Sequence, residues 1–259
     1  MISIAIAGSA GRMGKLLVAN TVSDPELKLV QAFDVQRVGE DAGEVAGVGK
    51  TGVIISDNID ELNADVLIDF TVADSSIKNI KKACEKGVKL VVGTTGFDEE
   101  QWHEIESVIS VPAVISPNFS IGVNIFWKIL EFATPYLSSY DIEIVEIHHR
   151  FKKDSPSGTA LKAGRLIKDI LEKKGIKREL KFERSGLSPR GEEIGIFGIR
   201  GGDVVGEHTV FYFGNGERIE ITHRALSRQA FASGAIQAAK WISRVEKPGI
   251  YTMDDVLGF

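Results

Sequence analysis

The residues best equipped for chemistry lie between Glu146 and Ala160, where the sequence reads EIHHRFKKDSPSGTA. Two histidines and two lysines fall within six residues of this stretch. Histidine titrates near neutral pH, and lysine changes its protonation readily when its ammonium group loses contact with water. We therefore interpret the stretch as a place where protons are transferred.

The second half of the same stretch predicts an anion site. Ser155 or Ser157 can cap a helix that runs through residues 160–167. The amides of Gly158 and Thr159 would then be donors at the positive end of that helix, where a carboxylate or a phosphate binds well. The alternative is a solvated basic loop, since charge runs usually lie on the surface. The helix start directly behind the charges favours a binding site.

A strand is expected to present these groups. Residues 141–147 alternate polar and apolar side chains with a period of two. This pattern predicts a half-buried strand that delivers His148, His149 and Arg150 to its end.

The composition narrows the choice of ligand. The chain has 259 residues and a net charge of −5, which argues against nucleic acid binding, so the positive charge at residues 150–153 is better explained by a small anion. Cys84 is the only cysteine, which excludes an intrachain disulfide and a multi-thiolate metal site. We expect no metal, no membrane span and no export signal, and hence a cytoplasmic protein.

A glycine turn near the start of the chain predicts a dinucleotide site. A short apolar run, residues 3–7, leads into the glycines of residues 8–14 and then into a helical segment, residues 15–22. The next strand, residues 27–33, ends in Asp34, whose carboxylate would accept the ribose hydroxyls of the adenosine. Asp34 favours NADH, but Arg37 could meet a 2′-phosphate, so both NADH and NADPH remain open.

The first half of the chain continues this strand and helix alternation. Strands are predicted at residues 65–70, 88–92 and 111–115, and helices at residues 75–86 and 98–110. We expect a Rossmann-type, doubly wound parallel sheet of the α/β class. Small or polar residues follow each strand, at Thr71, residues 93–96 and residues 116–119, and open sheets of this kind bind ligands at that edge.

After residue 121 the pattern changes to α+β. Helices are predicted at residues 121–137, 158–174 and 227–245, with the last returning to the first domain, and strands at residues 179–184, 194–200, 207–213 and 217–224. The late strands lack intervening helices and predict antiparallel pairing, with a hairpin turn at residues 213–217. Apolar side chains at Val210, Tyr212, Ile219 and Ile221 suggest a sheet face that is buried against another subunit.

The remaining candidates have plainer interpretations. His103 lies among acidic residues of a helix and is expected on the surface, and Cys84 is expected to be inert core. His208 and His223 lack the clustered thiolates or carboxylates of a metal site, so we expect them to hydrogen-bond across strands.

Several motifs in order make the chain resemble the dihydrodipicolinate reductase (4-hydroxy-tetrahydrodipicolinate reductase) family along nearly its whole length. They are Gly8-x-x-Gly11-Arg-Met-Gly14, Gly93-Thr-Thr-Gly96, Pro117-Asn-Phe-Ser-x-Gly-Val-Asn124, Glu146-x-His-His-Arg-x-Lys152, Pro156-Ser-Gly-Thr-Ala160, Gly202-Asp-Val-Val-Gly-Glu-His208 and Ile221-Thr-His-Arg-Ala225. The resemblance implies NADH- or NADPH-dependent reduction of a cyclic imine dicarboxylate to tetrahydrodipicolinate in the diaminopimelate route to lysine.

The resemblance also implies roles for individual residues. His148 corresponds to the proton donor and acceptor and Lys152 to a second proton donor, while His149, Ser157, Gly158 and Thr159 correspond to residues that hold the substrate carboxylates. The family's cofactor contacts correspond to Gly8, Ser9, Ala10, Gly11, Arg12, Met13, Asp34, Gly93, Thr94, Thr95, Ser116, Pro117, Asn118 and Phe119. Phe151 departs from the pattern, because some members carry a third histidine there.

The family fold implies a dinucleotide-binding domain made of residues 1–118 and 227–259. The inserted α+β domain, residues 119–226, would bind the substrate and form a homotetramer, and domain closure would assemble the site. Two rivals lack the histidine and lysine loop: a reductase or dehydrogenase acting on a sugar or amino acid, and a non-catalytic NADH sensor. The sensor would also need a DNA-reading module, which the sequence does not show.

Overall fold

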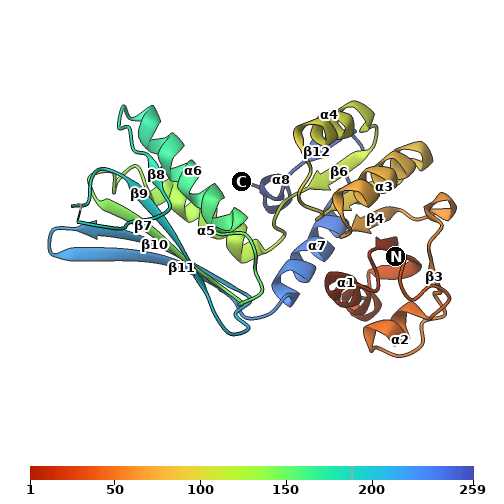
Figure 1. Ribbon diagram of the computed structural model, residues 1–259. Coiled ribbons are helices and arrows are strands. Elements are labelled where there is room, and N and C mark those ends of the chain that lie inside the picture. Colours follow the sequence, from red (N-terminus) through yellow and green to blue (C-terminus); the bar gives the residue numbers. More distant parts are fainter. Residues whose placement is uncertain (188) are drawn as a thin grey trace. The chain divides into compact units, whose positions relative to one another are not determined.

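The computed structural model describes residues 1–187 and 189–259. The chain divides into two compact units (Figure 1). Unit 1 contains Met1–Ile121 and Arg228–Phe259, and unit 2 contains Gly122–Ser227. Within the described part of the chain, no helix is both long enough and apolar enough to cross a membrane.

Unit 1 is built on a seven-stranded sheet in which all neighbouring strands are parallel. In spatial order the strands are β12 (Gly249–Tyr251), β6 (Pro112–Ile115), β5 (Lys89–Val92), β4 (Val66–Asp69), β1 (Ile2–Ala7), β2 (Leu27–Phe33) and β3 (Ile55–Ser56). The inner strands β4 and β6 are buried at every position, as expected when helices cover both faces of a parallel sheet. The predicted doubly wound sheet is confirmed.

Two separate apolar clusters lie on the faces of this sheet. Helices α1 (Arg12–Ser23), α2 (Ala42–Ala46), α7 (Gln229–Ile242) and α8 (Met253–Leu257) contribute to one cluster, and α3 (Ala73–Lys86) and α4 (Glu99–Val108) contribute to the other. Helix α7 therefore returns to the first domain, as predicted. The short elements α2, β3, β12 and α8, and a 3₁₀ turn at Ile59–Glu61, were not predicted, because two to five residues are too few to show a hydrophobic period.

Unit 2 is built on a mixed five-stranded sheet. In spatial order its strands are β11 (Glu217–Ala225), β10 (Gly206–Gly214), β7 (Asp141–His148), β9 (Ile194–Arg200) and β8 (Leu180–Lys181). The pair β10 and β11 forms the predicted antiparallel hairpin, with a turn at Asn215 and Gly216. Strand β8 has only two residues, fewer than the predicted span of 179–184.

The prediction that the late strands all pair antiparallel is wrong for β9. It pairs in parallel with β7 and with β8, while β10 occupies the other side of β7. Helix α6 (Gly158–Lys173) connects β7 to β8 and β9, and a helical crossover returns the chain in the parallel direction. The segment after β9 then passes to the far edge of β7, which leaves β7 central.

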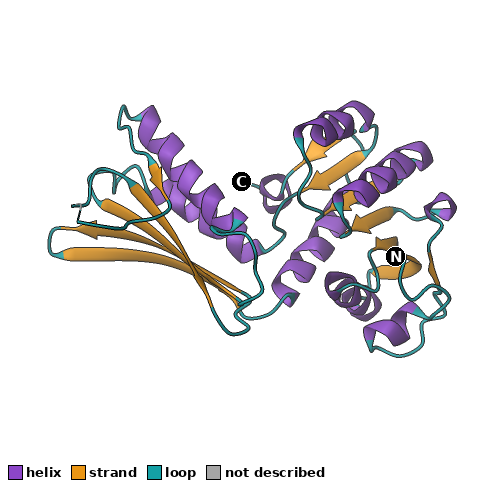
Figure 2. Cartoon of the chain, viewed as in Figure 1, coloured by secondary structure: helices purple, strands orange, loops and turns teal. Residues whose placement is uncertain are grey.

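Helices α5 (Ile121–Ala133) and α6 pack on one face of this sheet (Figures 1 and 2). Val210 and Tyr212, which the sequence suggested for a subunit interface, are fully buried in this cluster. The uncovered face instead presents Phe211 and Phe213, whose rings stack 5.7 Å apart. Strand side chains alternate between faces, so these two aromatic residues point away from the helices.

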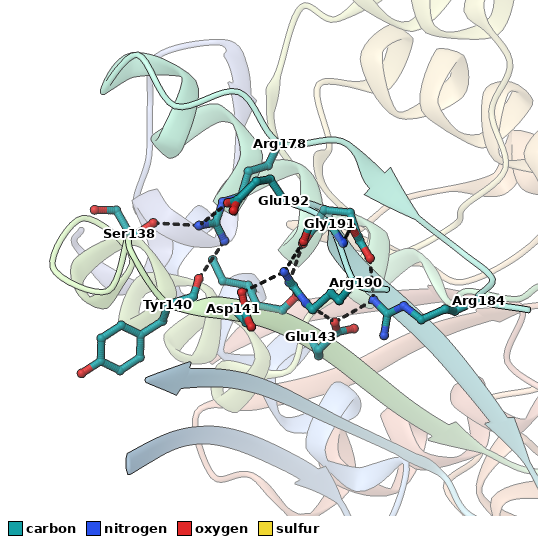
Figure 3. Close-up of polar contacts among 11 residues, drawn as sticks. Ser138, Tyr140, Asp141, Glu143, Arg178, Arg184, Arg190, Gly191 and Glu192 are labelled. Atoms are coloured by element: carbon teal, nitrogen blue, oxygen red, sulfur yellow. Dashed lines mark hydrogen bonds and ion pairs between the residues drawn. The ribbon is translucent and has the colours of Figure 1, made fainter. Parts of the chain in front are cut away.

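Arginines tie the segment between β8 and β9 to β7 (Figure 3). Glu143 Oε1 accepts hydrogen bonds from Arg184 Nη2 at 2.9 Å and from Arg190 Nε at 3.0 Å. Arg190 also donates to Asp141 at 2.8 Å. Asp141 and Glu143 lie on the outward phase of β7, so the charges there serve to hold a loop.

Candidate functional site

Strand β7 places two polar side chains where its pattern calls for apolar ones. Its inward phase begins with Ile142 and Ile144 and continues with Glu146 and His148. Glu146 has no exposed surface, and His148 is 8% exposed. Sequence reasoning did not assign a role to Glu146, although a charged residue in the buried phase of a strand is a recognisable sign, because carboxylates are rarely buried unless they are paired.

The carboxylate of Glu146 collects four N–H donors. The partners are His148 Nδ1 at 2.6 Å, the Ser157 amide at 3.0 Å, and Arg200 Nη1 and Nη2 at 2.7 and 2.6 Å. Burial alone would raise the pKa of Glu146, but the hydrogen bonds from His148 and Arg200 lower this pKa to about 2. Glu146 is therefore ionised at neutral pH, and it joins the end of β7 to the start of α6.

Ser157 is the residue that caps α6, which decides between the two predicted serines. Its Oγ accepts a hydrogen bond from the amide of Ala160 at 3.3 Å. His208 Nε2 lies 3.1 Å from the same oxygen. Burial lowers the pKa of His208 to about 3, so its imidazole is neutral.

His208 and His223 were expected to hydrogen-bond across strands, and among the described residues no hydrogen bond joins their two side chains. The two rings face each other on β10 and β11, but their centroids are 6.5 Å apart. His208 turns to Ser157 instead and lies edge-on to His148 at 5.2 Å.

The loop between β7 and α6 carries the other predicted substrate residues. Lys152 forms an ion pair with Asp154, with Nζ and Oδ2 2.8 Å apart. Burial would raise the pKa of Asp154, but this ion pair lowers it. The His149 Nδ1 atom is buried without a hydrogen-bond partner, and Phe151 is 80% exposed.

The beginning of α6 offers room for a ligand beside Gly158. A Cβ atom built there would meet nothing within 4 Å. The structure thus gathers His148, Ser157, Gly158 and Thr159 where β7 ends and α6 begins, with the lysine-bearing loop between them. Their predicted roles toward the substrate stay predictions.

Unit 1 has a cavity of about 460 Å³ at the carboxyl ends of β1, β2 and β4. The predicted cofactor residues Gly8, Gly11 and Asp34 line it. Gly8 has φ +79°, and a Cβ atom there would lie 2.5 Å from the carbonyl oxygen of Phe70. Only glycine adopts this backbone without strain and leaves the turn this close to β4. The volume of the cavity lies within the range of about 300–1,000 Å³ that is typical of pockets for small molecules.

Asp34 ties the glycine turn to the end of β2. Its two oxygens accept hydrogen bonds from the amides of Ala10 and Gln36, both at 2.9 Å. A carboxylate has about four acceptor positions, so Asp34 can still accept from ribose hydroxyls. Arg37, the predicted contact for a 2′-phosphate, pairs with Glu40 at 2.9 Å.

Asp69 holds the loops beside this cavity, a role that sequence reasoning missed. It has no exposed surface, and its Oδ1 accepts from the Thr71 amide, the Thr71 hydroxyl and the Thr94 hydroxyl at 3.0, 2.7 and 3.0 Å. Its Oδ2 accepts from Asn79 at 2.9 Å. An aspartate at the end of an otherwise apolar, buried strand was the sequence feature that could have indicated this role.

The other predicted cofactor residues do not line this cavity but occupy the turns after β1, β5 and β6 and the start of α1. They are Ser9, Ala10, Arg12, Met13, Gly93, Thr94, Thr95, Ser116, Pro117, Asn118 and Phe119. Phe119 is 2% exposed and packs on Phe70 with ring centroids 5.7 Å apart, so its side chain is part of the core of unit 1. His103, in contrast, is on the surface as predicted, with its side chain 82% exposed.

Comparisons with known proteins cover both units. Residues 2–119 match the family described as "Dihydrodipicolinate reductase, N-terminus", and residues 122–257 match "Dihydrodipicolinate reductase, C-terminus". The 4-hydroxy-tetrahydrodipicolinate reductase of Archaeoglobus fulgidus is 62% identical over 255 residues, which cover 98% of this chain and 99% of that protein. The enzyme of the same name from Methanosarcina barkeri is 52% identical over 267 residues, with both chains fully covered.

Solved structures agree with the sequence relatives. A dipicolinate-bound dihydrodipicolinate reductase from Paenisporosarcina sp. TG-14 has a TM-score of 0.77 and 25% identity, with 97% of each chain covered. The scyllo-inositol dehydrogenase of Lactobacillus casei has a TM-score of 0.61 and 15% identity, covering all of this chain and 93% of its own, and shows the fold alone. Unit 1 is the nucleotide-binding Rossmann domain, and the cofactors of the family are NADH and NADPH, as predicted. The chain belongs to the dihydrodipicolinate reductase family.

Proposed function

We propose that this chain reduces 4-hydroxy-tetrahydrodipicolinate to tetrahydrodipicolinate, with NADH or NADPH as the reductant, in the diaminopimelate route to lysine. The observation that carries the proposal is the assembly around Glu146, in which a buried imidazole and the start of α6 share one carboxylate. This assembly supports assigning proton exchange and anion binding to neighbouring groups of unit 2. The names of the curated relatives supply the substrate.

The start of α6 is suited to a carboxylate of the substrate. The capping residue Ser157 and the following Gly158 and Thr159 lie at the positive end of a sixteen-residue helix. The relative from Paenisporosarcina is described as dipicolinate-bound, and dipicolinate is a planar dicarboxylate. We assign the second carboxylate of the substrate to His149 and the lysine-bearing loop between β7 and α6, because one helix N-terminus binds one anion.

The proton is assigned to His148 and Lys152. A bound nicotinamide cofactor would supply the hydride, and the residues of unit 1 that would hold the cofactor include Gly8, Gly11 and Asp34. An imidazole or an ammonium group beside the reacting atoms stabilises the negative charge that hydride addition creates and delivers the proton in one geometry. Lys152 is 20% exposed and held by Asp154, which directs its ammonium group without burying it fully.

The test compares two neighbouring lysines. We expect Lys152→Ala to lower kcat by roughly a hundredfold or more, because general acids contribute about 10²–10⁴ in rate, and His148→Gln to act similarly. Lys153→Ala is the matched control, since Lys153 is exposed and carries the same charge one residue away. The measurement is the oxidation of NADH and of NADPH with the product of the preceding synthase. Equal turnover in the two lysine variants would remove the role of Lys152.

We also propose that the protein is a cytoplasmic homotetramer. The uncovered face of the unit 2 sheet carries Phe211 and Phe213, and Ile199 on β9 is 50% exposed. Apolar surface of this kind commonly marks a subunit contact. Light scattering should give about four times the 28.2 kDa of one chain, and Phe213→Glu should lower that mass. A single species of one chain's mass would contradict the proposal.

A further inference from the structure

Glu146 occupies a position that only a carboxylate can fill. Oε2 accepts from His148 Nδ1 and Arg200 Nη1, and Oε1 accepts from the Ser157 amide and Arg200 Nη2. Both oxygens therefore face two donors each. An amide side chain has one acceptor oxygen and one NH₂ group, so a glutamine in either orientation would turn a donor toward two other donors.

The charge on Glu146 decides where the proton of His148 sits. An ionised carboxylate can only accept hydrogen bonds, so the nitrogen 2.6 Å away must carry a hydrogen. That nitrogen is Nδ1, which leaves Nε2 as the atom that exchanges a proton in the neutral ring. Glu146 on the same strand and His208 on β10 contact the ring, and Arg200 on β9 binds the carboxylate of Glu146.

Two glycines on the neighbouring strands leave the space that this arrangement needs. A Cβ atom at Gly198 on β9 would lie 2.8 Å from Glu146 Oε1 and 3.3 Å from Arg200 Nη1. A Cβ atom at Gly206 on β10 would lie 2.9 Å from His148 Nε2. All three distances are shorter than ordinary van der Waals contact, so side chains at these positions would displace the carboxylate or cover the imidazole nitrogen.

We infer that Glu146 is a positioning residue that holds His148 in the form protonated on Nδ1 and fixes the amide of Ser157 at the start of α6. Arg200 is its counter-ion. The catalytic consequence rests on the proposed function, whereas the protonation pattern of His148 does not. The side chain of Glu146 thus determines which nitrogen of His148 exchanges a proton and also holds the start of α6 in place.

The chain offers a matched control on the same strand. Glu143 also pairs with two arginines, Arg184 and Arg190, but on the outward face of β7 (Figure 3). Its Oε1 accepts both hydrogen bonds, while Oε2 is buried without a partner. Glu143→Gln can therefore keep its hydrogen bonds and lose only the charge, whereas Glu146→Gln must lose hydrogen bonds.

The experiment reads the tautomer directly. In full-length protein labelled with ¹⁵N-histidine, NMR distinguishes a protonated from an unprotonated ring nitrogen, and His148→Gln assigns the signals. We expect wild type and Glu143→Gln to carry the proton of His148 on Nδ1, and Glu146→Gln to shift it wholly or partly to Nε2. kcat should fall roughly 10- to 100-fold in Glu146→Gln, the range seen when a carboxylate that orients a histidine is removed, and stay within about twofold in Glu143→Gln.

The outcomes separate the two proposals. An unchanged tautomer in Glu146→Gln, or a kcat equal to that of Glu143→Gln, overturns the role of Glu146. Full activity in His148→Gln overturns the role of His148 in proton exchange, and a wild-type protein that does not oxidise NADH or NADPH with this substrate overturns the proposed function, but both leave the tautomer result standing. If Glu146→Gln does not fold, Glu146→Asp is the second variant, because its carboxylate oxygens are withdrawn by one methylene group. It should lower kcat by roughly fivefold or more while the circular dichroism spectrum stays unchanged. A wild-type kcat in Glu146→Asp would count against the inference.

Discussion

The two units each bury one carboxylate next to their candidate site, and the two carboxylates are held in different ways. Asp69 in unit 1 and Glu146 in unit 2 are both fully buried, and each accepts four hydrogen bonds. The donors to Asp69 are hydroxyls and amides, which carry no formal charge. The donors to Glu146 include a guanidinium and an imidazole.

This difference matches what each site has to do. Hydroxyl and amide donors of Thr71, Thr94 and Asn79 hold loops in place and take no part in proton exchange, which suits a unit that binds a nucleotide. The imidazole of His148 can change its protonation, and the negative charge of Glu146 can balance the positive charge of a protonated ring. A carboxylate buried among charged partners is also the costlier arrangement, because the removal of one partner leaves a buried charge uncompensated.

The largest test of the comparison removes the counter-ion of Glu146. Arg200→Met should lower the free energy of unfolding by about 3–5 kcal/mol, because it leaves a buried carboxylate with too few partners. Arg184→Met is the control: Arg184 contacts Glu143, which keeps Arg190, and its own side chain is 32% exposed, so we expect a loss of less than about 1 kcal/mol. Urea unfolding measures both values. Equal losses of unfolding free energy in the two variants would show that Glu146 does not depend on its counter-ion more than Glu143 does.

A second test uses pH. The pKa of Glu146 is about 2 in the folded protein and near its ordinary value of 4.5 when unfolded. Because folding lowers the pKa of Glu146, its ionised carboxylate stabilises the folded protein at pH values above about 4.5. This stabilisation is lost as the pH falls from about 4.5 toward 2. The contribution is about 3 kcal/mol, because a pKa difference of one corresponds to about 1.4 kcal/mol. The free energy of unfolding of wild type minus that of Glu146→Gln should shrink over this range, and a difference that is independent of pH would contradict the assignment.

The smallest expected effect is at Asp69. In Asp69→Asn one oxygen still faces Thr71 and Thr94, and the new NH₂ group can face Asn79 if that amide turns to present its oxygen. We expect a loss of about 1 kcal/mol in unfolding free energy and a KM for NADH within about threefold of wild type. Thermal unfolding and steady-state kinetics check both values. A loss as large as that of Arg200→Met would mean that the charge of Asp69 matters as much as that of Glu146.

Much of the fold follows from short-range patterns in the sequence. The span of β2 was predicted without error, β7 to within one residue, and the β10 and β11 hairpin was located at its Asn-Gly turn. Ser157 was one of two predicted caps for α6. These features depend on alternation, turn residues and capping, which act over a few neighbouring residues.

The partners of these features were decided by tertiary structure. Arg200 lies fifty-four residues beyond Glu146, and nothing near either residue indicated that β9 would pair in parallel with β7 and bring them together. Asn79 and Thr94 reach Asp69 in the same way, from helix α3 and from the turn after β5. The sequence by itself therefore determined which residues could exchange a proton or bind an anion. Only the packed structure decided which donors surround each buried carboxylate, because such contacts join segments whose separation along the chain carries no local pattern.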